Sequence, residues 1–365
     1  MRKRVTVDTS LNKAIELSVK NIGHSEMGRD FALVTLDAIK FIIARVPNSF
    51  GPGWSRNICV EYRKEFGPIP DSEKREAISE IVSFVLGTQL LNAGFTEYDH
   101  EWQTLTLFAK TSWGGAYSRS VSEGIPISPV NLGIRSFIIK EEKIEELLCG
   151  LIPKYLDLRD KRRLKEALWR YWISRDTPPG ADLPVLSSAL EIIMKAWFDS
   201  EESKSTKFYM PQKEFNKLIG EGLKNIEGKL DEYIENKTKS LEQGNTDLLE
   251  IQEIKELKNT VIGKVRNSNQ KSLTKQYPAF FKGIGLKTGE IEDGAIRARN
   301  QMAHGDNDNN GKEEESEKER MYTYAYQTLF HRVFLKLLGY EGNYVDRSVI
   351  GFPEKHINSL LGNYE

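Results

Sequence analysis

The sequence predicts a mainly helical protein, in which a C-terminal helical bundle follows a smaller mixed α/β region. Short runs rich in β-branched and aromatic residues occur in the first part of the chain, at 57–62 and 103–108. From about residue 140, apolar residues instead recur at helical spacing along several successive segments. Short breaks separate these segments, and amphipathic helices joined in this way must bury their apolar stripes against one another.

The mixed region alternates strand-like and helix-like patterns. Between the two strand-like runs, apolar residues recur at helical spacing from 78 to 85, which predicts a helix. Asp71 or Ser72 can cap its first turn, and Gly94 marks its expected exit. Residues 112–133 are rich in glycine, serine and proline, so we expect a long loop there.

Six or seven helices are expected after that loop. The first two carry apolar stripes and are separated by TPPGADLP at 177–184. A long charged helix is expected over roughly 211–240, and another follows EQGNTD. The last strong helix begins near the acidic run 313–317, where the helix dipole favours negative charge. We therefore divide the chain into a mixed region at 1–140, a helical domain at 141–345 and a C-terminal tail at 346–365.

Composition limits the function classes. A length of 365 residues suggests two domains or three, and 39% hydrophobic residues suffice for sizeable cores. A net charge of −1 does not indicate nucleic-acid binding, which would need a local basic patch. Cys59 and Cys149 fit no metal or disulfide pattern, so we expect thiols in a reducing cytoplasm. No apolar run follows the basic first residues or reaches membrane-spanning length, so neither a signal peptide nor a membrane span is expected.

The stretch RARNQMAHG, at 297–305, is the strongest candidate for a functional site. A helix is expected from about Glu290 to His304, with Gly305 at the position where glycine commonly ends helices. His304 then lies at the C-terminal end, whose carbonyl dipoles favour a protonated imidazole. Such a histidine titrates near neutral pH, as general acid–base catalysis requires.

The polar residues of this stretch divide between two faces of the helix. Arg299 precedes His304 by five residues, which places it about 140° away around an ideal helix axis. Arg297 and Asn300 precede His304 by seven and four residues and share its face. Two chains related by a two-fold axis could bring Arg299 and His304 into one site, from both sides of a shared groove.

Within this stretch, RNQMAH resembles the R-x4-6-H signature of HEPN domains, in the form where a polar residue, here Asn300, follows the arginine. The segments ALWRYWIS and LPVLSSALEIIMKAWF, with ALE near the middle of the second, resemble the ApeA-like HEPN subgroup, as does 329–344. The resemblance covers roughly residues 150–345. It implies a HEPN-type helical bundle, preceded at 1–140 by a sensor-like or regulatory region.

The resemblance also implies a metal-independent endoribonuclease, often a homodimer, used in antiphage defence through abortive infection or as a toxin. Arg299, His304 and Asn300 would be catalytic, no metal or other cofactor would be needed, and a phage-derived trigger or regulatory partner would control the enzyme. The chemistry of RNA agrees, because its own 2′-hydroxyl is the nucleophile. His304 can move protons, Arg299 can stabilise the phosphorane charge, and Asn300 can orient the histidine or a phosphate.

A locally basic window at 255–287 adjoins the motif and could bind the phosphate backbone of RNA. Tyr277, Phe280 and Phe281 in this window either stack on bases or belong to the core. An ordinary solvated helix face would carry the same charges. The residues expected to bind RNA are Arg297, Lys264, Arg266, Lys271 and Lys275.

Other interpretations stay open. Arg299 and His304 can simply stabilise the end of a helix, since cations are common there. The domain can also be a catalytically silent HEPN module for dimerisation or RNA binding within a larger defence complex. Glu191 lies between apolar residues and either pairs with a buried arginine or reaches solvent. His331 lies off the apolar stripe of the last helix, so we expect it to be exposed.

Overall fold

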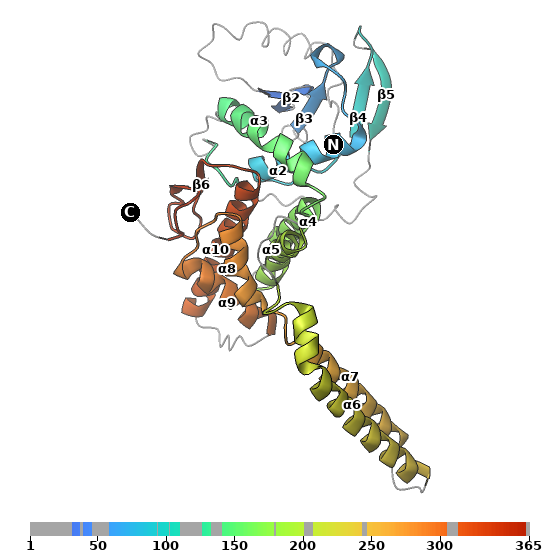
Figure 1. Ribbon diagram of the computed structural model, residues 1–365. Helices are drawn as coiled ribbons and strands as arrows, with labels where there is room; N and C mark the ends of the chain where they lie inside the picture. The colour runs from blue at the N-terminus through green and yellow to red at the C-terminus, as the bar shows by residue number, and fades with distance from the viewer. Residues whose placement is uncertain are drawn as a thin grey trace. The chain divides into compact units, whose positions relative to one another are not determined.

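A computed structural model describes residues 31–36, 39–45, 58–92, 94–101, 103–109, 126–132, 141–178, 180–200, 207–242, 247–304 and 313–362. The described chain is mainly helical and has a small β region toward its N-terminus (Figure 1). The coarse fold class predicted from the sequence is therefore confirmed. No helix among the described residues is long and apolar enough to cross a membrane.

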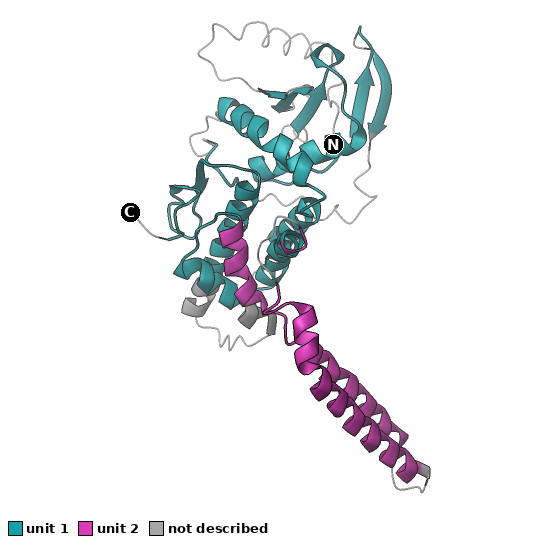
Figure 2. Ribbon diagram, viewed as in Figure 1, with its two compact units in different colours: residues 1–197, 284–365 teal, residues 198–283 magenta. Residues whose placement is uncertain are grey.

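The chain forms two compact units (Figure 2). Unit 1 comprises Met1–Trp197 and Ile284–Glu365, and unit 2 comprises Phe198–Gly283. The boundary expected between residues 140 and 141 lies within unit 1 and stays a prediction. Elements on both sides of that boundary belong to unit 1, because the mixed region packs on the helix that follows it.

The β region of unit 1 contains a three-stranded antiparallel sheet in the order β1-β2-β3. β1 (Phe31–Leu36) pairs with β2 (Ile39–Arg45), which pairs with β3 (Ile58–Tyr62). A second pair of antiparallel strands consists of β4 (Gly94–Tyr98) and β5 (Thr104–Ala109). The two strands predicted from β-branched and aromatic residues are thus confirmed as β3 and β5.

Helix α3 (Glu141–Leu158) connects the β region to the helices of unit 1. It packs on β1 and on helix α2 (Ser72–Leu86). Its Glu145 accepts a hydrogen bond from the backbone N–H of Leu33 at 2.7 Å. Its Ile144, Leu148 and Ile152 are buried. This packing makes the mixed region part of the same compact unit as the helices.

Helix α2 has the N-terminal cap that the sequence indicates but a different end. Asp71, one of the two expected caps, accepts a hydrogen bond from the backbone N–H of Lys74 at 2.8 Å. The helix ends before Gly87 rather than near Gly94, so the predicted exit was wrong. Gly87 has φ +69°, a left-handed conformation that glycine adopts easily. A Cβ there would lie 2.0 Å from the backbone nitrogen of Ser128, so a segment distant in sequence determines where the helix stops.

The remaining helices of unit 1 follow the predicted segments. They are α4 (Leu164–Asp176), α5 (Asp182–Phe198), α9 (Glu290–His304) and α10 (Glu313–Leu337). Helix α10 packs on α9, and its Phe330 stacks on Tyr171 of α4 with ring centroids 4.9 Å apart. The apolar residues of α10 from Leu329 to Leu335 have no exposed surface. The helical core of unit 1 is therefore built around this last helix.

His331 on α10 is buried, with 1% of its surface exposed, so the expected surface position was wrong. Its Nε2 lies 2.8 Å from the hydroxyl oxygen of Tyr171, and the ring of Phe84 meets it edge-on. Burial lowers the pKa of His331 well below its usual 6.5, and the charges of Arg347 and Arg175 lower it further. The prediction failed because α10 is covered on more than its main apolar face, which the pattern of one helix cannot show.

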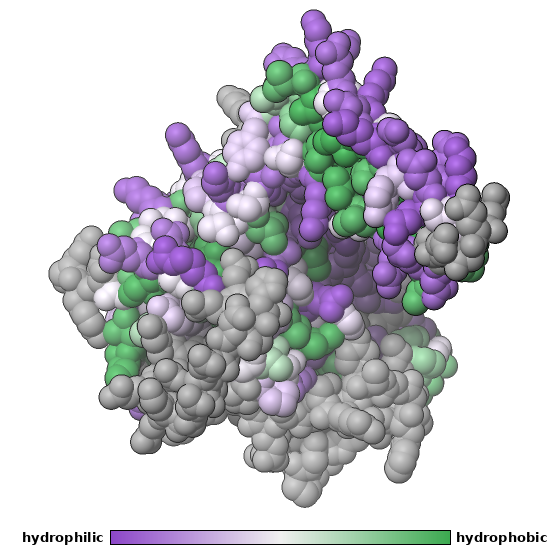
Figure 3. All heavy atoms as spheres, turned by 90° about the horizontal axis from the view of Figure 1, so that it is seen from below, coloured by the Kyte–Doolittle hydropathy of each residue, from purple (hydrophilic) through white to green (hydrophobic). Residues whose placement is uncertain are grey.

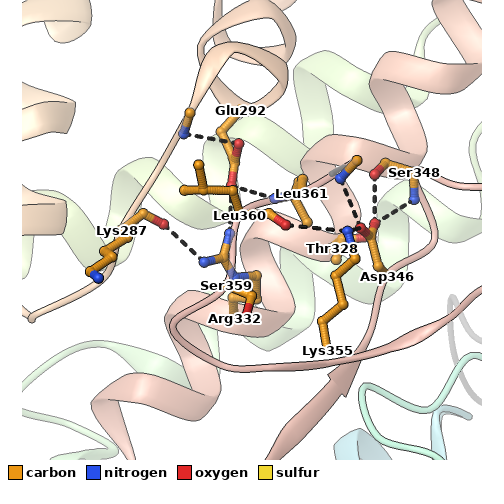
Figure 4. A network of polar contacts seen from close by, with 12 residues as sticks. Lys287, Glu292, Thr328, Arg332, Asp346, Ser348, Lys355, Ser359, Leu360 and Leu361 are labelled. Atoms are coloured by element: carbon orange, nitrogen blue, oxygen red, sulfur yellow. Dashed lines mark hydrogen bonds and ion pairs between the residues drawn. The ribbon is translucent and has the colours of Figure 1, made fainter. Parts of the chain in front are cut away.

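The segment expected to be a C-terminal tail contributes to the core of unit 1. It includes strand β7 (Glu354–His356), which pairs with β6 (Asn343–Val345). Figure 4 shows the polar network in which Arg332 of α10 forms an ion pair with Glu292 of α9 at 2.5 Å. Neither side chain has any exposed surface. Arg332 also donates hydrogen bonds to the backbone oxygens of Lys287 and of Ile357, which lies just after β7.

Asp346 completes this network. It has no exposed surface and forms an ion pair with Lys355 at 3.1 Å. Its carboxylate accepts hydrogen bonds from Ser348 and from the backbone N–H of Gly362. Each buried charge thus has an opposite charge and further hydrogen bonds, which is the condition under which a charge can be buried.

Unit 2 consists mainly of a helical hairpin. Its two long helices, α6 (Gln212–Glu242) and α7 (Leu248–Asn267), run antiparallel and contact each other (Figure 1). They confirm the two long charged helices predicted in this part of the chain. Helix α8 (Leu273–Gly283) follows. At the open end of the hairpin, the backbone N–H of Tyr209 donates to the backbone oxygen of Asn269 at 2.9 Å.

Apolar side chains also reach the surface of the molecule. Figure 3 shows one face, on which hydrophobic residues (green) lie among hydrophilic ones (purple). Within the described chain, the most exposed large apolar residues include Leu105 and Leu107 of β5 and Leu218, Leu249 and Leu257 of the hairpin. Scattered exposed apolar residues need no explanation, but several on one element indicate a surface that can be covered by another molecule.

Candidate functional site

Helix α9 carries the motif, and it contacts α10 and α5 within unit 1. Its first turn holds Glu290, Glu292 and Asp293, which interact favourably with the positive end of the helix dipole. Gly294 lies against Tyr322 of α10, and a Cβ at this glycine would be 3.0 Å from the tyrosine ring. The absence of a side chain therefore allows α9 and α10 to approach closely.

Arg299 lies in the last turns of α9 and points to helix α5. Its Nε donates a hydrogen bond to the hydroxyl of Ser187 at 3.0 Å, and its Nη2 forms an ion pair with Glu191. Ser187 and Glu191 are four residues apart, so they lie on the same face of α5. Two nitrogens on one edge of the guanidinium are thus held by two side chains from one helix.

The ion pair between Arg299 and Glu191 is largely shielded from water. The side chain of Arg299 is 22% exposed and that of Glu191 is 11% exposed. Lys195 lies one turn further along α5, with its Nζ 3.5 Å from the other carboxylate oxygen of Glu191. Ser187 also donates its hydroxyl proton to the backbone oxygen of Pro184 at 2.7 Å, which leaves its oxygen oriented to accept from Arg299. The arrangement holds a partly accessible guanidinium in a defined orientation.

Glu191 is the residue whose environment the sequence left undecided. Of the two alternatives, burial beside an arginine is the one observed. Its position within an apolar stripe was the signal, because a carboxylate there requires a cationic partner. Ser187 was missed, since a serine on a helix gives no indication of its partner. The partner lies 112 residues away in sequence.

The remaining motif residues are described to different extents. His304 is the last residue of α9, as predicted, but its side chain and that of Asn300 lie outside the described part of the structure, as does Gly305. Arg297 lies on the exposed face of α9. Because seven residues make nearly two helical turns, position 304 lies about 20° from position 297 around the helix axis.

The other residues expected to bind RNA belong to unit 2, whereas the motif belongs to unit 1. Lys264 and Arg266 lie on α7 and are exposed, and Arg266 forms an ion pair with Glu227 of α6 at 3.2 Å. Lys275 is exposed on α8, and Lys271, just before that helix, is partly buried.

The aromatic residues of the basic window belong to the core. Tyr277, Phe280 and Phe281 are buried, with at most 3% of their surface exposed. The core interpretation is therefore confirmed, and stacking of these rings on bases is contradicted. Tyr277 and Phe281 instead stack on each other, with ring centroids 5.6 Å apart.

A shallow cavity of about 180 Å³ lies elsewhere in unit 1, between the start of α2 and the end of α3. Its charged centre is Arg159, which already pairs with Glu80 at 2.7 Å and Glu76 at 3.3 Å. None of the motif residues lines it. The described residues contain no group of three or more histidine, cysteine, aspartate or glutamate side chains arranged to hold a metal ion.

Comparison with known proteins finds no matching family model, no matching curated protein and no matching solved structure. The site is therefore interpreted from its own residues and geometry.

Proposed function

We propose that this chain is a metal-independent, HEPN-type endoribonuclease that cleaves RNA by attack of the 2′-hydroxyl. We further propose that it acts as a cytoplasmic homodimer in antiphage defence or as a toxin. One observation carries the proposal. Arg299, the arginine of the R-x4-6-H resemblance, is held against α5 by Ser187 and Glu191, five residues before a histidine at the end of the same helix.

A restrained arginine suits phosphodiester cleavage. Stabilisation of a developing charge is most effective when the donor is already oriented, because no reorganisation is then needed during the reaction. Contacts with Ser187 and Glu191 restrict the rotation of Arg299 about its long side chain. Glu191 also compensates the positive charge while no substrate is bound, which lowers the cost of partly burying it.

The proposed reaction is a transesterification followed by release of products. The 2′-oxygen forms a bond to phosphorus, the bond between phosphorus and the 5′-oxygen breaks, and the products are a 2′,3′-cyclic phosphate and a 5′-hydroxyl. One proton leaves the 2′-hydroxyl and one reaches the 5′-oxygen. His304 would transfer protons, Arg299 would stabilise the additional negative charge on the phosphoryl oxygens, and Asn300 would orient the histidine or the phosphate.

Two copies of the chain would contribute to one site. Arg299 and His304 lie about 140° apart on an ideal helix, so a single α9 does not present both to one phosphate. A two-fold axis beside α9 would place His304 of one copy near Arg299 of the other. Arg297, which is exposed on the face of position 304, would then bind the RNA backbone. Lys264, Arg266, Lys271 and Lys275 are the further candidates for that role.

A second candidate function is a catalytically silent HEPN module that dimerises or binds RNA in a larger defence complex. The same ion pair favours it, because an arginine neutralised by Glu191 is also what a structural link between α9 and α5 requires. The two candidates differ in what His304 does, since a silent module has no need of a titrating imidazole.

The test measures RNA cleavage by purified wild type, His304→Ala and Arg299→Ala, each with a matched control. His100→Ala removes a histidine whose side chain is 88% exposed, and Arg320→Ala removes an exposed arginine of α10. We expect the two motif variants to lose at least about 100-fold in rate, as is usual when a catalytic group is removed. The controls should cleave like wild type.

The products and the metal dependence test the mechanism itself. Cleavage should persist in a chelator and should yield 2′,3′-cyclic phosphate ends. Ends carrying a 5′-phosphate, or strict dependence on a divalent metal, would contradict the mechanism. Equal activity of wild type and both motif variants would contradict the site. A wild-type protein that cleaves no RNA but still binds it would favour the silent module.

A further inference from the structure

The hairpin of unit 2 leaves much of its apolar surface uncovered. Phe215 on α6 and Ile251 and Ile262 on α7 are buried, but the other large apolar residues of these two helices are half-buried or exposed. Leu218 is 72% exposed and Leu257 is 54% exposed. Two helices alone cannot enclose an apolar seam, because each covers one side of the other. A further pair of helices against the hairpin would bury these residues.

Charges on the hairpin are segregated along its length. We define the basal half as residues 212–231 and 258–267, and the distal half, next to the connection between the helices, as 232–242 and 248–257, so that each ion pair between α6 and α7 lies within one half. The basal half contains seven basic and four acidic residues, whereas the distal half contains six acidic and three basic residues. Each hairpin therefore has a positive end and a negative end.

We propose that the hairpin of unit 2 binds the hairpin of a second copy of this chain in antiparallel orientation, forming a four-helix bundle. A two-fold axis across the hairpin places the basal half of each copy against the distal half of the other. Both ends of the interface then bring opposite charges together. A parallel arrangement would place acidic residues against acidic ones and basic against basic, which is repulsive.

Apolar contacts follow from the same arrangement. Leu218 and Ile226 of the basal half come opposite the distal half of the partner, which exposes Tyr233 and Leu257. Helices of 31 and 20 residues are about 45 and 30 Å long, and a helix pair is about 20 Å wide. The common face is therefore on the order of 700 Å² per copy, close to the roughly 800 Å² of a stable protein interface.

RNA is the other occupant that the basic residues of this unit could indicate. The acidic excess of the distal half would repel phosphates along half of the hairpin, whereas it complements the basal half of a second copy. The charge pattern therefore favours the second copy. This inference involves unit 2 and none of Arg299, Asn300 or His304. An antiparallel pair of hairpins joins the two copies of unit 1 at opposite ends of the bundle, so the two-fold contact proposed around α9 would be a separate one. Lys264 and Arg266 would then serve the hairpin dimer rather than RNA.

Charges outside the links between α6 and α7 allow a direct test. Those links are ion pairs of Lys237 with Glu250, of Lys258 with Asp231 and of Arg266 with Glu227. A distal variant carries Glu232→Lys, Glu253→Lys and Glu256→Lys, and its hairpin is basic along its whole length. A basal variant carries Lys217→Glu, Lys224→Glu and Lys264→Glu, and its hairpin is acidic along its whole length. All six residues are exposed.

Sedimentation equilibrium of the full chain measures the outcome, with circular dichroism to show that helix content is unchanged. We expect wild type to dimerise, with a dissociation constant that rises with salt. Each variant alone should dimerise at least 10-fold more weakly, and an equimolar mixture of the two should form heterodimers as tight as the wild-type dimer.

Two results would overturn the proposal. The first is a dissociation constant that is the same for wild type and both variants, which would place any dimer contact outside the hairpin and leave the nuclease proposal standing. The second is a monomeric wild type whose hairpin binds RNA in a manner abolished in the basal variant, which would assign the surface to RNA.

Discussion

The polar network around α10 and the ion pairs of the α6–α7 hairpin contain the same chemical groups in opposite environments. Arg332 and Glu292 are both completely buried. Arg266 and Glu227 are 60% and 33% exposed. The contribution of an arginine–glutamate pair to stability therefore depends on its access to water. A buried pair makes the fold intolerant of change, whereas an exposed pair contributes mainly to the charge pattern of the surface.

In the buried network, each charged group has several polar partners. Arg332 contacts Glu292, the backbone oxygen of Lys287 at 2.9 Å and that of Ile357 at 3.2 Å. Glu292 also accepts a hydrogen bond from the backbone N–H of Leu361 at 3.2 Å. Removal of one partner would leave the others with unsatisfied groups in a fully buried region. The hairpin has no such constraint, since water can replace either partner of its exposed pairs.

The largest effect is expected for Glu292→Ala, which leaves the buried charge of Arg332 without its partner. The free energy of unfolding should fall by about 3–5 kcal/mol, measured by urea denaturation. A loss below about 1 kcal/mol would show that water reaches this network. The buried pair would then contribute no more to stability than the exposed pairs of the hairpin.

The apolar core should show the same contrast. Leu329→Ala removes a fully buried side chain of α10 and should cost about 2–5 kcal/mol, because it creates a cavity. The matched change Leu218→Ala, on the exposed face of the hairpin, should cost less than about 0.5 kcal/mol in dilute, monomeric protein. Similar losses in the two variants would contradict the different burial of the two regions.

The free energy of unfolding should depend on pH through the buried His331 but not through an exposed histidine. His331 has a lowered pKa in the folded protein because of burial and of Arg347 and Arg175, so the unfolded chain binds more protons as the pH falls below about 6.5. Its contribution to stability is therefore complete above about pH 6.5. Below that pH, the free energy of unfolding should decrease by up to about 1.4 kcal/mol per pH unit.

Urea denaturation of wild type and His331→Gln between pH 5 and about pH 7.5 would measure this effect. The variant cannot titrate, so its stability should depend less on pH. His100→Ala, which removes an exposed histidine, should keep the wild-type slope. A wild-type slope in His331→Gln would mean that other groups cause the dependence.

A smaller effect is expected for Glu191→Gln, since the pair with Arg299 is partly exposed. The free energy of unfolding should fall by about 1–2 kcal/mol, as for a hydrogen bond to a charged group. Lys195→Ala, on the same helix but more exposed, is the matched control and should change it little. RNA cleavage measured on the same Glu191→Gln protein should fall if the orientation of Arg299 matters for catalysis, and unchanged cleavage would assign the pair to structure alone.

The smallest effect is expected within the hairpin. Glu227→Ala removes the partner of Arg266 and should lower the free energy of unfolding by less than about 1 kcal/mol. The difference in stability between variant and wild type should disappear at high salt, because salt screens exposed charges. Thermal unfolding of both proteins at low and high ionic strength measures this difference. A large loss that resists salt would show that this pair is buried, for example by a second copy of the chain.

Local sequence patterns were enough to predict which segments form helices and strands, because both structures depend on the spacing of neighbouring residues. The repeat of apolar residues and the strand-like runs correctly predicted β3, β5 and the long helices, and α9 spans the expected Glu290–His304. Residue types also indicated that Glu191 needs either a cation or water. These inferences rest on neighbours within a few residues, whose spacing the backbone geometry determines.

Which residues are buried together, by contrast, depends on how the helices and strands pack. His331 is covered because α2 and α4 pack on sides of α10 that its own apolar stripe does not mark. Helix α2 ends at Gly87 because Ser128 lies against it, and Ile357, just after β7, contributes to the network of Arg332. Arg299 and Glu191 are 108 residues apart in sequence. Such contacts depend on how separate elements pack, and no local pattern contains that information.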